Sequence, residues 1–150
     1  MWPKKDKPKI LIVEDNESNH PLFRESFEQA GFDVIISQNA DGEFAEDVAA
    51  LKPDIISMDI MIGKLGVAIQ RDGLQTIQLL KSRKETKHIP IIVMSSLYEE
   101  GKVRQAKALG AADFVNLQGH AITRVPDIFK KYLTHPDQYH PTHPIFREMK

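Results

Sequence analysis

The segment KPDIISMDIM, residues 52–61, decides the fold class of this chain. Aliphatic residues without polar alternation are typical of a parallel strand that is covered on both faces. Pro53 ends any preceding helix, and Asp59 then stands at the carboxyl end of the apolar run. We therefore predict a strand over residues 54–59 that ends in an acid.

Other apolar runs repeat this pattern along the chain and predict strands over residues 9–13, 33–37, 90–94 and 112–117. Apolar residues at helical spacing predict helices over about residues 18–30, before Pro53, and around Leu74, Val103 and Phe129. The last helix must begin late, because Pro126 is tolerated only in a first turn, which leaves residues 118–124 as loop. This alternation predicts an α/β doubly wound parallel sheet with right-handed crossovers and helices on both faces.

Composition narrows the function classes. The chain has 150 residues, 41% of them hydrophobic and 27% charged, as expected for one soluble domain. A formal net charge of −1 provides no overall field for nucleic acid, so we expect no direct nucleic-acid binding. The absence of cysteine excludes disulfides and thiolate metal sites. Without a secretory signal or a membrane-spanning apolar run, we expect a cytoplasmic protein that does not contact the membrane.

The two ends of the chain are expected to lie outside the domain. We predict an N-terminal leader over residues 1–8, the domain over 9–134 and a C-terminal tail over 135–150. The tail contains three His-Pro pairs, at His135, His140 and His143, and has no apolar period. We therefore expect it to be extended, with its histidines exposed to solvent.

Acids and hydroxyls follow several of the predicted strands. Parallel strands place their carboxyl ends at one edge of the sheet, so Glu14, Asp15 and Asp59 should converge there. Carboxylates this close repel one another unless a cation intervenes, and an oxygen-only cluster favours Mg²⁺. Asp59 could then attack a phosphoryl group, with Ser95 as a hydroxyl donor. Each acid could instead cap the following helix, but their number at one edge favours a metal site.

Four segments, residues 10–16, 52–61, 89–96 and 110–114, together resemble the response-regulator receiver domains of bacterial two-component signalling. The resemblance covers about residues 8–133. It implies a flavodoxin-like (βα)5 fold with strand order 2-1-3-4-5, and it implies roles for six residues. By resemblance, Asp59 is the phosphoacceptor; Glu14, Asp15, Asp59 and the backbone carbonyl of Met61 hold magnesium; and Ser95 and Phe114 form the switch.

The chain departs from the family pattern in two places. Leu117 stands where the family has a phosphoryl-binding lysine, and Gln118 stands where a proline follows it. The loop over residues 60–71 is longer than in typical members, and it is either decoration or part of the site. In the second case, Lys64 or Arg71 could fold back over the pocket as a substitute cation.

Two function hypotheses follow from these residues. In the first, the chain is a stand-alone response regulator, not an enzyme. It would accept a phosphoryl group from a histidine kinase or histidine phosphotransfer protein and signal by contact with a downstream protein. That contact would use the face of the fourth helix, fifth strand and last helix. In the second, favoured by Leu117, it is a pseudo-receiver that acts as an adaptor without phosphorylation. A hydrolase or flavin protein is poorly supported, since no glycine-rich phosphate loop is present.

Overall fold

A computed structural model describes residues 7–62, 71–96 and 99–148. Five parallel strands form one sheet in the order β2-β1-β3-β4-β5. The strands are β1 (Lys9–Val13), β2 (Asp33–Ser37), β3 (Ile55–Met58), β4 (Ile91–Ser95) and β5 (Asp113–Asn116). The predicted flavodoxin-like sheet and its strand order are therefore confirmed. Within the described ranges, no helix is long and apolar enough to cross a membrane.

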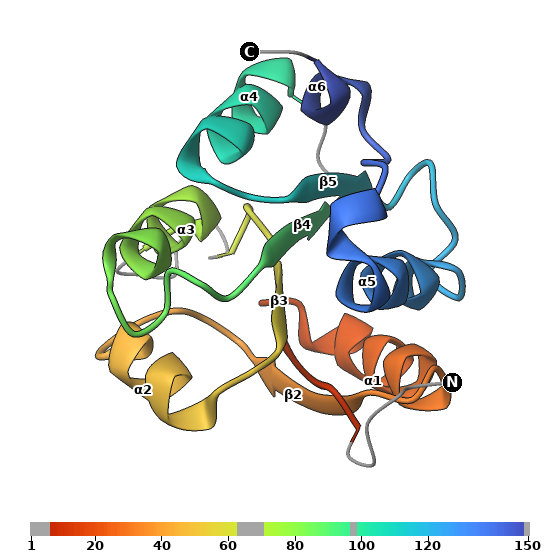
Figure 1. Ribbon diagram of the computed structural model, residues 1–150. Coiled ribbons are helices and arrows are strands. Elements are labelled where there is room, and N and C mark those ends of the chain that lie inside the picture. Colours follow the sequence, from red (N-terminus) through yellow and green to blue (C-terminus); the bar gives the residue numbers. More distant parts are fainter. Residues whose placement is uncertain (1–6, 63–70, 97–98, 149–150) are drawn as a thin grey trace.

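Helices cover both faces of the sheet (Figure 1). The helical segments are η1 (Glu17–Asn19), α1 (His20–Gln29), α2 (Phe44–Leu51), α3 (Gly73–Ser82), α4 (Glu100–Leu109), α5 (Val125–Thr134), η2 (Pro136–Gln138) and α6 (Pro144–Arg147). Helix α5 begins at Val125 with Pro126 in its first turn, which confirms the late start. Gly110 ends α4 with a φ of 106°, a left-handed conformation that favours glycine.

The core lies in two layers, one on each face of the sheet. One layer joins α1 and α5, where Phe27 and Phe129 meet edge to face with ring centroids 5.2 Å apart. The other layer joins α2, α3 and α4 through residues such as Phe44 and Ile77. Both layers leave the carboxyl ends of β1, β3 and β4 free to carry polar side chains, which is where the candidate site lies.

The tail differs from its prediction. His135 and His140 are exposed, as expected, but the prediction for His143 is wrong, because it is only 9% exposed. The chain turns back after α5, and α6 packs beside α4 at the edge of the sheet formed by β5 (Figure 1). Ile145 is buried in the same layer of core as α4. Residues 139–148 are therefore folded onto the domain and do not form an extended tail.

Candidate functional site

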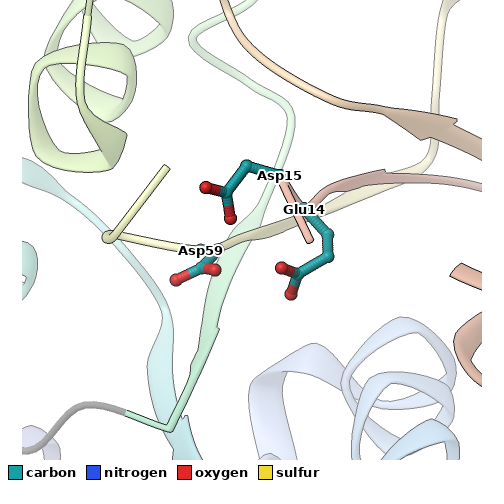
Figure 2. Close-up of side chains that lie close together, drawn as sticks. All are labelled: Glu14, Asp15 and Asp59. Atoms are coloured by element: carbon teal, nitrogen blue, oxygen red, sulfur yellow. The ribbon is translucent and has the colours of Figure 1, made fainter. Parts of the chain in front are cut away.

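Three carboxylates meet at the carboxyl edge of the sheet (Figure 2). Glu14 and Asp15 follow β1, while Asp59 follows β3, the neighbouring strand. The backbone N–H of Asp59 donates to the carbonyl of Val13 at 3.1 Å, which continues the pairing of the two strands. One oxygen from each carboxylate lies within 4.8 Å of the others. Adjacent strand ends thus bring acids 44 positions apart in sequence, Asp15 and Asp59, into one cluster.

Burial and mutual repulsion disfavour full ionisation of the cluster. Burial, followed by repulsion from Asp59, raises the pKa of Glu14 from 4.5 to about 7. Burial also raises the pKa of Asp59, and repulsion from Asp15 adds to the rise. The N–H of Met61 and the hydroxyl of Ser95 oppose this rise by hydrogen bonding to the Asp59 carboxylate. A cation between the acids would relieve the repulsion.

Backbone donors orient two of the acids, the buried Glu14 and the half-buried Asp59. The N–H of Met61 donates to Oδ1 of Asp59 at 3.0 Å, and the N–H of Asn16 donates to Oε2 of Glu14 at 3.0 Å. The ring of His20 also hydrogen bonds through Nε2 to the backbone carbonyl of Glu14, at 2.7 Å. The two backbone N–H contacts hold the carboxylates in place, and the His20 contact fixes the backbone that carries Glu14.

Gly73 brings the start of α3 against the backbone that carries Asp59. A Cβ at this position would overlap the carbonyl oxygen of Asp59 and the Cα of Ile60. Asp72 caps the helix by accepting from the N–H of Gln75 at 2.8 Å, and the Gln75 side chain accepts from the N–H of Asp72 at 2.9 Å. The Asp72-Gly73 pair therefore anchors α3 beside the site at the end of the long loop.

The acids open into a cavity of about 480 Å³. One part of its lining consists of Leu117, His120 and Ile122, from the segment between β5 and α5. Sequence reasoning missed His120, although the late start of α5 was a signal that this segment would be loop rather than helix. No lysine or arginine from the described ranges lines the cavity. Leu117 thus contributes an apolar surface to the site.

The structure describes only one of the two candidate substitute cations, Arg71. Arg71 donates through Nη1 to the carbonyls of Ala40 and Gly42, at 2.7 and 3.1 Å. These contacts tie the start of α3 to the loop before α2, and Arg71 does not line the cavity. Lys64 lies outside the described residues.

The two switch candidates lie on neighbouring strands. Ser95 ends β4, is buried, and hydrogen bonds to Asp59. Its carbonyl accepts from the N–H of Leu117 at 2.9 Å. Phe114 lies in β5, is buried, and meets the ring of His143 edge to face, with centroids 5.8 Å apart. The cavity and the folded tail are therefore linked through two paired strands.

The donor set of the cluster fits a hard divalent cation. All three side chains offer carboxylate oxygens, and no histidine or cysteine belongs to the cluster. Such a set suits magnesium, which keeps several waters and needs few protein ligands. A phosphoryl oxygen could occupy one of the remaining positions.

A five-stranded parallel sheet of this order, with an acidic cavity at its carboxyl edge, has the architecture of a flavodoxin-like receiver domain. The sequence profile of the response regulator receiver domain matches residues 10–118, and the chain belongs to that family. Among its relatives, the polar-differentiation response regulator DivK of Brucella anthropi is 31% identical over 125 residues, which are 83% of this chain and 94% of that protein.

Solved structures agree on the fold. Chemotaxis protein CheY4 of Vibrio cholerae superposes with a TM-score of 0.69 at 17% identity, over 83% of this chain and 98% of that one. A CheY-like receiver domain protein of Methanospirillum hungatei gives a TM-score of 0.73 at 15% identity, over 90% and 100% of the two chains. At these identities the likeness establishes the fold alone.

Proposed function

We propose that this chain is a single-domain response regulator that accepts a phosphoryl group on Asp59. The donor is a phosphohistidine of a histidine kinase or histidine phosphotransfer protein in the cytoplasm. The observation that carries the proposal is the cluster of Glu14, Asp15 and Asp59 within 4.8 Å, with Asp59 held by two hydrogen-bond donors. Glu14, Asp15, Asp59 and the backbone carbonyl of Met61 would hold magnesium.

The transfer is a displacement at phosphorus. A carboxylate oxygen of Asp59 attacks, a P–O bond forms, and the P–N bond of the phosphohistidine breaks, with the imidazole nitrogen taking up a proton. Bound magnesium would offset charge on the transferred group. The N–H of Met61 and the hydroxyl of Ser95 orient the nucleophile and support the acyl phosphate that results.

Leu117 favours the second candidate, a pseudo-receiver that binds its partner without phosphorylation. An aliphatic side chain lines the cavity where a fixed ammonium would offset a phosphoryl charge. Of the two candidate substitute cations, we still propose Lys64. Arg71 is excluded because its guanidinium hydrogen bonds to the loop before α2.

Mass spectrometry separates the two candidates. After incubation with acetyl phosphate and magnesium, we expect the intact chain to gain the mass of one phosphoryl group. Asp59→Asn should abolish the gain, and the exposed control Asp137→Asn should preserve it. No gain in the wild-type chain would support the pseudo-receiver, and a gain that persists in Asp59→Asn would overturn the assignment of the acceptor.

A further inference from the structure

Asp113 is a buried carboxylate that is bonded mainly to the folded tail. It has no exposed surface and accepts hydrogen bonds from the hydroxyls of Tyr139 and Thr142, at 2.5 and 2.9 Å. The backbone N–H groups of Thr142 and His143 also donate to it, at 2.8 and 3.2 Å. Four of its five hydrogen bonds thus come from one short segment, the fifth being donated by the N–H of Phe114 at 2.7 Å. A buried carboxylate needs such donors, so this position is built to receive a peptide turn.

The rest of the segment follows the surface of β5 and α4. The ring of His143 rests against Phe114, and Ile145 is buried in the core layer that contains Phe114 and Val103. Lys107 donates to the carbonyls of Ile145 and Glu148 at 2.7 and 3.0 Å, at the end of α6.

The segment contributes little apolar surface to the core. It is attached by few buried apolar groups: Ile145 is buried and Phe146 is partly buried. The ion pair between Arg104 and Glu148 is exposed, and such pairs contribute little to stability. Next to it, residues 134–142 and the end of α5 line an open cavity of about 520 Å³, and the main ring contact between them is that of Tyr139 with Tyr132, with centroids 5.1 Å apart. Segments with few buried contacts open at low free-energy cost.

We propose that residues 139–148 are a displaceable intramolecular ligand, which covers the face of β5 and α4 where the sequence led us to expect contact with a downstream protein. A partner protein would bind there by presenting the same chemistry. It needs hydroxyl and backbone N–H donors for Asp113, a ring edge for Phe114, an aliphatic side chain in place of Ile145, and an acid near Arg104. This proposal does not depend on phosphorylation of Asp59, so it can fail while the proposed function holds.

A synthetic peptide of residues 137–148 tests the surface in the full-length chain. Ile145→Asp should release the attached segment, because it places a charge in the apolar layer. The fluorescent wild-type peptide should then bind this variant at least about tenfold more tightly than it binds the wild-type chain, whose own segment competes. The exposed control His140→Asp should bind the peptide as weakly as wild type does.

The α4 part of the proposed binding surface is tested in the Ile145→Asp variant. Lys107→Ala should weaken peptide binding, while Lys102→Ala on the same helix should not. Unfolding curves must show that each variant is folded, and amide exchange of residues 139–148 in the wild-type chain gives a second readout. Equal peptide binding to wild type and to Ile145→Asp would overturn the proposal, as would no binding to either together with slow exchange of the segment. A concentration-dependent dimer that exchanges its segments would show instead that the occupant is a second copy of the chain.

Discussion

The acidic cluster should make the metal-free chain less stable as the pH rises, and Glu14 should carry most of this effect. Its pKa is raised from 4.5 to about 7. Between these two values the folded chain retains a proton that the unfolded chain has released. The folded state thus binds more protons, and the free energy of unfolding falls as the pH increases through this interval.

The size of the effect follows from the shift. One pKa unit corresponds to about 1.4 kcal/mol, so a rise from 4.5 to about 7 sets an upper limit of roughly 3.5 kcal/mol. Because the carboxyl group opens onto a cavity, solvent screening should reduce this to about 1 to 2 kcal/mol. Magnesium requires the deprotonated carboxylate, so adding it should restore stability at about pH 8 and have little effect at about pH 5.

Urea unfolding at about pH 5 and about pH 8, with a chelator or with magnesium, measures this dependence. Glu14→Gln removes the titrating group and should flatten the difference between the two pH values. The exposed control Glu85→Gln should retain the wild-type difference. The reasoning is refuted if the metal-free wild type is equally stable at both pH values, or if Glu14→Gln keeps the full dependence.

Other changes test the surroundings of the site. Gly73→Ala should lower the free energy of unfolding by about 1 to 3 kcal/mol, because the added Cβ overlaps the backbone of Asp59; urea unfolding curves measure this loss. Ser57→Ala should raise the free energy of unfolding by about 1 kcal/mol, because the Ser57 hydroxyl is buried without a hydrogen-bond partner in the described structure; a clear loss of stability would indicate a hidden partner. Leu117→Lys should tighten binding of beryllofluoride with magnesium at least about tenfold, or roughly 1.4 kcal/mol, while Arg71→Ala leaves it unchanged; calorimetry on both variants decides.

The positions of the strands and the identity of the acids were predictable from the sequence. Uninterrupted apolar runs such as residues 10–13 and 55–58 are local signals, and strict alternation with helices leaves few topologies. Once the sheet is parallel, acids that follow neighbouring strands must share an edge, which is how Asp15 and Asp59 meet. The late start of α5 was also predictable from a local signal, because a single proline, Pro126, determines where the helix begins.

Partners distant in the sequence were decided only by the tertiary structure. Arg71 is directed to the carbonyls of Ala40 and Gly42 because the loop before α2 lies beside the start of α3, and no sequence pattern signals this contact. His120 reaches the cavity because the loop after β5 passes over the site.

The tail was the largest difference between sequence and structure. Its helix spans only Pro144–Arg147, and one buried aliphatic residue in a stretch rich in histidine and proline has no periodicity to detect. What holds it is the carboxylate of Asp113, which lies 29 positions before Thr142 and 30 before His143. Periodicity reports which face of an element is apolar, but the pairing of a buried carboxylate with distant backbone donors depends on how the chain returns to the sheet.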